Sequence, residues 1–241
     1  MKRLFLSIKK GEELRFLGHL DFLRTMERAI MRANIPAAFS EGFNPHMKVS
    51  FDAALAVGVT ADPLYMELRL ERDLSCEEVQ EMLSAQLPKG IEVHEVLEAP
   101  LEWPKFSAYF NEDVYEMEGP VVGEYDPKTV QDTIDRFNAL NSFSYVRVTP
   151  KKVREMDIKT MILDPMSVRI ENDRAFLTFS LVRKNTGIVQ PKDIWKIFAE
   201  SFGMPWGADE FICSRIGVYH REGDHRYSAA DMGIFSKAVK G

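Results

Sequence analysis

The chain has only two cysteines, Cys76 and Cys213, among its 241 residues. Iron–sulfur clusters and structural zinc sites need several cysteine ligands, so a cysteine-based cluster within this chain is excluded. So few cysteines also suit a reducing compartment. The chain has no Walker motif and no G-x-G-x-x-G. We therefore expect a protein without a cofactor or a metal.

Long apolar runs are also missing. No stretch approaches the roughly 18 apolar residues that a membrane span needs. The first five residues, MKRLF, do not begin the long apolar run and small-residue cleavage site of a signal peptide. We expect a cytoplasmic protein with no membrane partner.

An excess of positive charge is absent as well, because the formal net charge is −6. That balance argues against a wholly basic nucleic-acid binder and leaves room for a local basic face. The hydrophobic fraction of 45 % and the charged fraction of 28 % are typical of a folded, soluble protein. The length suits one large domain or two ordinary ones.

The order of elements in residues 1–100 is strand, helix, strands, helix, strand. The clearest signals are the alternating strands over residues 4–9 and 64–70, the helix N-cap Ser75 and the stop at 88–90. A helix before Asn34 has its apolar face at Leu20, Leu23, Met26 (or Glu27), Ile30 and Ala33. This order is the split βαβ pattern of a ferredoxin-like domain.

Residues 105–220 repeat this plan after a proline-containing boundary at 98–104. We expect a strand at 106–115, a helix opened by Asp126-Pro127, a strand at 143–148, a hairpin at 168–182, a helix at 191–202 and a strand at 211–219. The predicted fold class is therefore α+β, with two tandem ferredoxin-like halves built on antiparallel sheets. Residues 221–241 are expected to form a polar tail that either docks as a short helix or stays mobile.

Three arginines of the first helix, Arg24, Arg28 and Arg32, stand four residues apart and predict a cationic stripe. Guanidinium groups bind phosphate through two hydrogen bonds, so the stripe is suited to a nucleic-acid backbone, with Arg15 and Lys48 as extensions. The alternative is a solvated face on which Asp21 and Glu27 pair with these charges.

The segment Gly42-Phe-Asn-Pro-His46 predicts a loop whose side chains could bind a ligand or take part in a reaction. Phe43 is placed to stack on a base, with Asn44 and His46 shaping the site. The alternative is a structural turn with Phe43 in the core. His19 and His46 together are weak candidates for general acid–base cleavage of RNA, against structural roles for both.

Two further clusters of charged residues could either bind a ligand or simply face solvent. Lys151, Lys152 and Arg154 begin a second basic run that ends at Lys159, which is either a phosphate-contacting segment or a solvated connector. His220, Glu222, Asp224 and His225 fit a surface charge cluster better than a metal site.

The segment Arg15-Phe-Leu-Gly-His-Leu-Asp, the arginine-bearing helix and Gly42-Phe-Asn-Pro-His resemble the radical SAM-linked proteins of the domain-of-unknown-function 2344 family. Residues Arg154-Glu-Met-Asp-Ile-Lys159 resemble a later charged motif of that family, with lysine in place of its usual arginine. The resemblance implies a radical SAM partner and, by association, an RNA substrate. It implies no cluster in this chain, since the three necessary cysteines are absent.

We therefore expect a binding module that holds RNA, or an RNA–protein substrate, for a radical SAM partner, with no catalytic activity of its own. One alternative is an RNA-modifying or RNA-cleaving enzyme that uses His19 and His46. The other alternative is a protein–protein adaptor.

Overall fold

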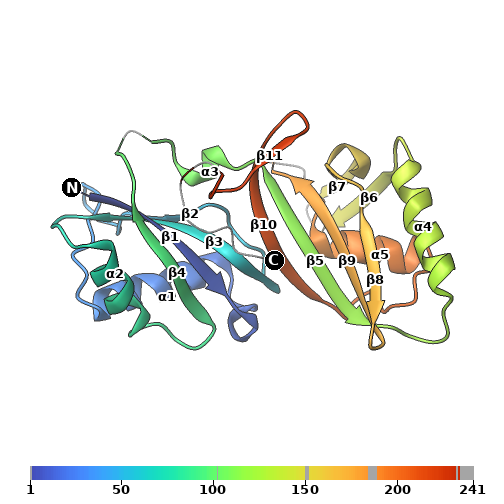
Figure 1. The fold of residues 1–241 in the computed structure, drawn as a ribbon, viewed down its shortest axis with the longest axis horizontal. Helices are drawn as coiled ribbons and strands as arrows, with labels where there is room; N and C mark the ends of the chain where they lie inside the picture. Colours follow the sequence, from blue (N-terminus) through green and yellow to red (C-terminus); the bar gives the residue numbers. More distant parts are fainter. Residues whose placement is uncertain (1, 102, 150–151, 184–188, 232, 234–241) are drawn as a thin grey trace. The chain divides into compact units, whose positions relative to one another are not determined.

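The computed structural model describes residues 2–101, 103–149, 152–183, 189–231 and 233. The chain divides into two compact units. Unit 1 comprises residues 1–110 and 217–241, and unit 2 comprises residues 111–216. Both units are mixed α/β structures with mainly antiparallel strands and few helices (Figure 1).

Unit 1 contains three long strands and two helices of more than two turns. Its elements are β1 (Lys2–Lys10), η1 (Glu12–Leu14), α1 (His19–Arg32), β2 (Val49–Phe51), β3 (Val59–Leu70), α2 (Cys76–Ser84), β4 (Ile91–Glu98), the short helix α3 (Phe106–Tyr109), the end of β10 (Ile212–Glu222) and β11 (His225–Tyr227).

Strand β1 lies between β3 and β4 and is antiparallel to both, while β2 pairs with the other edge of β3. The register sets Leu4 opposite Leu68 and Leu6 opposite Met66, and all four side chains are buried. Their burial fixes this register, because a shift of one residue would turn an apolar set of side chains to the other face.

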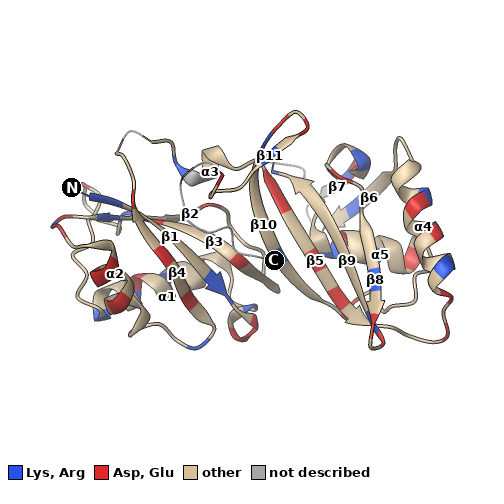
Figure 2. Cartoon of the chain, in the orientation of Figure 1, with Lys and Arg blue, Asp and Glu red and all other residues tan. Residues whose placement is uncertain are grey.

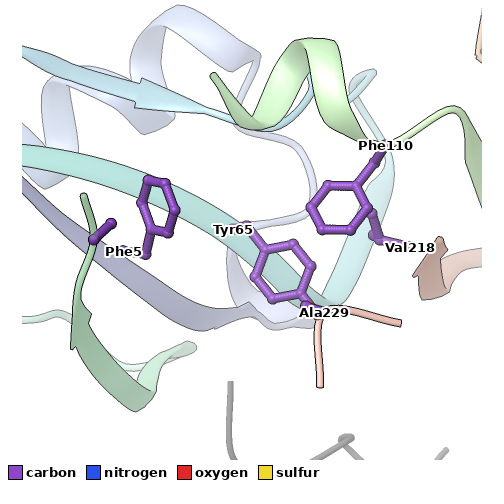
Figure 3. Packing of buried hydrophobic residues seen from close by; sticks show 6 residues of the cluster. Phe5, Tyr65, Phe110, Val218 and Ala229 are labelled. Carbon is purple, nitrogen blue, oxygen red and sulfur yellow. The ribbon is translucent and has the colours of Figure 1, made fainter. Parts of the chain in front are cut away.

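Part of the core of unit 1 is built from segments far apart in sequence. Phe5, Tyr65, Phe110, Val218 and Ala229 pack together, and the rings of Tyr65 and Phe110 stack with centroids 5.3 Å apart (Figure 3). Residues 221–231 belong to the predicted polar tail, and they dock on unit 1 through a strand rather than as a short helix. They form β11 and bring Ala229 into the core.

Unit 2 contains β5 (Glu112–Pro120), α4 (Pro127–Ala139), β6 (Ser144–Thr149), β7 (Lys152–Asp157), η2 (Ile158–Thr160), β8 (Ser167–Glu171), β9 (Arg174–Val182), α5 (Pro191–Ser201) and the start of β10. Its strand order is β10-β5-β9-β8, and β6 and β7 form a separate two-stranded sheet. The two units meet in sequence at residues 110 and 111, later than the predicted boundary at 98–104.

Most predicted elements are present, and the structure differs from three local predictions. Residues 106–109 form α3 and not the start of a strand. The basic run after Lys151 is neither a loop nor a connector, because residues 152–157 pair with β6 as strand β7. The predicted apolar face of α1 is also rotated, since Leu20 is exposed and Phe22 is buried.

Candidate nucleic-acid interface

A buried lysine holds the loop that leads into α1. Lys10, at the end of β1, is only 1 % exposed, and its Nζ donates hydrogen bonds to the carbonyl oxygens of Leu17 at 3.0 Å and Arg15 at 3.5 Å. Burial lowers the pKa of Lys10 to about 8, because the charged ammonium loses water. The backbone N–H of Gly58 also donates to the Arg15 carbonyl, at 2.8 Å. The backbone on both sides of Phe16 is therefore fixed.

The side chains on the outside of this loop are apolar. Phe16 is 69 % exposed, and Leu20 and Val57 are each 64 % exposed. The Arg15 guanidinium lies 4.6 Å from the centre of the Phe16 ring. Val57 lies close enough to Gly18 that a β-carbon there would sit 3.7 Å from Val57 Cγ2. A short surface region therefore combines three exposed apolar groups and a cation.

Helix α1 begins with this region and then carries the arginines. The first turn of the helix is closed by a hydrogen bond from the Phe22 N–H to the Gly18 carbonyl. The helix ends before Asn34, which adopts a left-handed backbone with φ of 53°. Phe22, Met26, Ala29 and Ile30 are buried, so the opposite side of the helix faces solvent.

Arg24, Arg28 and Arg32 are all exposed on that side. Arg24 forms an ion pair with Asp21 at 3.4 Å between two largely exposed groups, and such pairs contribute little. Arg32 donates to the Gln86 carbonyl at 2.7 Å. For Arg28, the described part of the chain provides no ion pair. The Asp21 pairing agrees with the solvated-face alternative, and the exposure of all three arginines fits both that alternative and a phosphate-binding stripe.

The loop at residues 41–46 exposes its aromatic residue. Phe43 is fully exposed, so the alternative in which it packs into the core is wrong. Gly42 has a φ of 122°, a backbone conformation that favours glycine. The loop is closed at its base because the Ser40 N–H donates to the His46 carbonyl at 2.8 Å and the His46 N–H donates to Ser40 Oγ at 2.9 Å. Asn44 and His46 are exposed and Lys48 is half-buried.

The two histidines contact different neighbours. His19 is half-buried, its ring lies 5.9 Å from that of Phe51, and it lines a crevice of about 10 Å³ together with Lys10 and Leu55. His46 is exposed at the 41–46 loop. Across the described residues no hydrogen bond or ring contact joins the two histidines. A joint catalytic role therefore stays a prediction.

Within the described part of the second basic run, Lys159 has internal partners. Lys159 donates from Nζ to the carbonyls of Phe137 and Asn138, at 3.1 and 3.0 Å, and so caps the C-terminal turn of α4. Arg154 is half-buried and lies opposite Arg147, which pairs with Asp193 at 3.6 Å. Lys151 lies outside the described residues, and Lys152 begins β7.

Charges elsewhere on the surface occur in mixed groups. A hollow of about 610 Å³ beside the 11–18 loop is lined by the ion pairs Lys9–Glu92 and Lys89–Glu13. Figure 2 shows both signs of charge along α4 and acidic residues on α2. These groups neutralise one another, so they offer less to a polyanion than the α1 row does.

Two buried ion clusters were not predicted. Arg3 and Glu67 pair at 2.7 Å in unit 1, and Asp113 binds both Arg183 and Arg215 in unit 2. Both faces of β1 are buried near Arg3, since Leu4 and Phe5 are both buried and Arg3 itself is only 1 % exposed. These clusters stabilise the sheets internally and present no free charge to a ligand.

The remaining chemically versatile residues have structural partners. His220 donates through Nδ1 to the Tyr109 carbonyl at 2.7 Å, and its Nε2 lies 3.0 Å from Glu222. The Glu222 carboxylate, helped by that carbonyl, raises the pKa of His220. Burial raises the pKa of the Cys213 thiol to about 12, so this cysteine is a poor nucleophile. Within the described ranges no group of three or more His, Cys, Asp or Glu side chains could hold a metal ion.

Among the helices that the structure describes, none has the length and apolar character needed to cross a bilayer. No curated protein matches the chain. A crystal structure described as that of an unknown protein from Galdieria sulphuraria is 12 % identical, with 75 % of this chain and 81 % of that chain covered and a TM-score of 0.27. A family model matches residues 3–191. The chain therefore belongs to the family described as uncharacterized protein conserved in bacteria (DUF2344).

Proposed function

We propose that the chain is a binding module whose α1 arginines hold the backbone of RNA. The observation that carries this proposal is the exposed row Arg24, Arg28 and Arg32, of which only Arg24 has a carboxylate partner among the described residues. Four residues of helix rise about 6 Å, so successive guanidinium groups are spaced to meet successive phosphates. The fully exposed ring of Phe43 supports the same function, because unpaired bases stack on aromatic side chains.

The net charge of −6 makes this binding local. The acidic remainder of the surface repels a polyanion, so contact is favourable only where the arginines outnumber nearby carboxylates. Affinity should accordingly fall steeply with salt, because phosphate contacts release condensed counterions.

The test is a titration of fluorescent RNA at two salt concentrations with the Arg24→Ala/Arg28→Ala/Arg32→Ala variant. Losing three phosphate contacts should lower the affinity at low salt and reduce the slope of log K against log salt by about 2 for single strands. The matched control is Lys9→Ala/Lys89→Ala/Lys196→Ala, which removes the same charge from lysines that have acidic partners. Equal losses of RNA affinity in the two variants would mean that the effect comes from net charge and not from the arginine row. If the unaltered protein bound no RNA, the proposal would be refuted.

We further propose that the module presents RNA, or an RNA–protein substrate, to a radical SAM protein. The support is the resemblance of residues 15–21 and 42–46 to radical SAM-linked proteins, together with a surface suited to a protein. The β6–β7 hairpin exposes Val146, Val148 and Val153, of which Val148 and Val153 are directly opposite. Exposed apolar groups that gather on one face are typical of protein interaction sites.

The protein–protein contact has its own test. The chain would be co-expressed with a radical SAM protein from a bacterium that carries a family member, and co-purified iron would be measured. The Val146→Thr/Val148→Thr/Val153→Thr variant should lose the partner, because β-branched threonine keeps the strand propensity while removing apolar contact. Retention of the partner by this variant would exclude the hairpin.

We also propose that both units are split βαβ modules of the ferredoxin-like kind. Unit 1 has the strand neighbours β4-β1-β3-β2, and unit 2 has the order β10-β5-β9-β8 with β6 and β7 as an insertion after α4. In both, the first and third strands are central, which is the arrangement that two split βαβ units produce. An experimental structure in which either order differs would refute this.

A further inference from the structure

We propose that Phe16, Leu20 and Val57 form a stacking platform for unpaired bases of single-stranded RNA at the beginning of the arginine row. This inference rests on the proposed RNA-binding function and names the form of RNA that is bound. The three side chains are called the platform below.

The platform is an unusual use of apolar surface. Three large apolar side chains, each at least 64 % exposed, come from residues 16–20 and from Val57, which lies against Gly18. Single exposed apolar residues are ordinary, whereas a group in one small region marks a contact site. A ring with one face open to solvent offers the kind of surface on which a base stacks.

The loop that presents Phe16 is held in one conformation at a cost. Lys10 is buried beneath this loop, and its ammonium group donates to the carbonyls of Arg15 and Leu17 on both sides of Phe16. Burial of a cation without a carboxylate is unfavourable, so a chain that retains it gains something from the loop geometry. A fixed ring loses little freedom on binding, and preorganisation of that kind raises affinity. Lys10 is therefore a positioning residue for the platform.

Leu20 of the platform lies in line with the arginines. Leu20, Arg24, Arg28 and Arg32 are spaced by four residues and lie along one ridge of α1, and all four are exposed. Phe16 precedes this ridge by four residues in the loop that enters the helix. A strand whose phosphates contact the arginines would therefore bring its next bases to Leu20 and Phe16.

The charge around the platform favours a nucleic acid over an apolar protein segment. The Arg15 guanidinium lies over the Phe16 ring, and Arg24 follows Leu20 by one turn. Both have exposed carboxylate partners, Glu12 at 3.6 Å and Asp21 at 3.4 Å. Further along the helix, Arg28 and Arg32 form no ion pair with any described residue, so the row as a whole keeps an excess of positive charge. Cations beside an aromatic ring match a base that is joined to phosphates. A duplex keeps its bases paired and stacked internally, so only a single strand or an unpaired loop can place a base on Phe16.

The experiment compares a fluorescent 12-nucleotide single-stranded RNA with the duplex of the same sequence. Phe16→Ala should lower the affinity for the single strand about tenfold, because one base–aromatic stack is lost, and should leave duplex affinity and the salt slope unchanged. Phe16→Trp should restore single-strand binding. Tyr125→Ala, an exposed aromatic residue of unit 2, is the matched control and should have no effect.

The outcomes separate this inference from the function on which it rests. If Phe16→Ala leaves single-strand affinity unchanged while the triple arginine variant loses it, the platform is refuted and the arginine row stands. Equal loss of single-strand and duplex binding would also refute stacking. If Phe16→Ala retains RNA but loses the co-purified radical SAM protein, the occupant is a protein and the inference fails. Binding of neither RNA by the unaltered protein refutes the proposed function itself.

Lys10→Met tests the positioning role. Methionine keeps most of the buried volume and removes the ammonium group that holds the loop. Below the melting temperature of the variant, it should lose the preference for single strand over duplex and retain duplex affinity. A Lys10→Met protein that keeps the preference would refute the positioning role, and so would one that loses both affinities in parallel.

Discussion

Two stretches of this chain are rich in basic residues, and the fold uses them in opposite ways. On α1, Arg24, Arg28 and Arg32 are exposed. Around β6 and β7, Arg147 pairs with Asp193 and Lys159 caps α4. The charge of a segment therefore does not reveal whether it binds a ligand or stabilises the fold. What distinguishes the two stretches is how far their partners are buried, because Arg24 and Arg32 meet exposed acceptors whereas Lys159 and Arg147 bind partly buried ones.

The comparison is sharpest for basic residues that are fully internal. Asp113 accepts from Arg183 Nε at 2.8 Å and also contacts the buried Arg215. Asp113→Ala should lower the free energy of unfolding by about 3–5 kcal/mol, because it removes the carboxylate that pairs with Arg183 and with the buried Arg215. Denaturant unfolding would measure this. Asp21→Ala, which frees only the exposed Arg24, is the counterpart, and a loss as large as that of Asp113→Ala would contradict the distinction.

Lys10 allows the same distinction to be tested through pH. Its pKa is about 8 in the folded chain against an ordinary 10.5. Between these values the unfolded chain binds more protons, so the contribution of Lys10 makes stability rise with pH, by about 3 kcal/mol across the range.

The measurement is the difference in unfolding free energy between the unaltered chain and Lys10→Met from pH 7.5 to 10.5. As pH rises, the unfolding free energy of the unaltered chain should increase relative to that of Lys10→Met. A constant difference would mean that Lys10 titrates alike in both states.

The two basic stretches differ next in what a single substitution removes. Lys159→Met should lower the free energy of unfolding by about 1–3 kcal/mol, because two charge-assisted hydrogen bonds to the end of α4 are lost. RNA affinity should not change. Arg28→Ala should do the reverse, with a stability change within about 0.5 kcal/mol. If a fully folded Lys159→Met variant bound RNA more weakly, the second stretch would have to be counted as part of the RNA interface.

The smallest expected effect is that of His46→Ala. His46 is exposed and contributes to its loop through backbone groups, so its side chain should matter by less than about 0.5 kcal/mol. Thermal unfolding and RNA titration of the variant would check this. If His46→Ala abolished an RNA-cleaving activity without altering stability or binding, the catalytic alternative would replace the binding module.

Local signals gave most of the elements. Ser75 forms a capping box with Glu78, and Asp126 caps α4 ahead of Pro127. The turn of the β8–β9 hairpin has Asn172 and Asp173 at positive φ. Such signals depend on neighbours in sequence, so they can be recognised without the fold.

What failed depended on long-range partners. Leu20 and Phe22 both fit a helical period, and only packing against Phe51 decides that Phe22 is buried. Lys10 shares the strand face of Leu4, Leu6 and Ile8, which was an available signal of burial. The role of Lys159 required knowing where α4 ends in space. The arginine stripe was predicted because its spacing alone determines which residues share one side of a helix.

The return of the chain to unit 1 has a consequence for biosynthesis. Val218 and Ala229 complete the cluster around Phe5, Tyr65 and Phe110, yet they are translated after the whole of unit 2. During synthesis, unit 1 lacks the part of its core that Val218 and Ala229 supply until the whole of unit 2 has been made, so unit 2 can complete its fold first. Because domains generally fold in the order of synthesis, this chain reverses the usual sequence of completion.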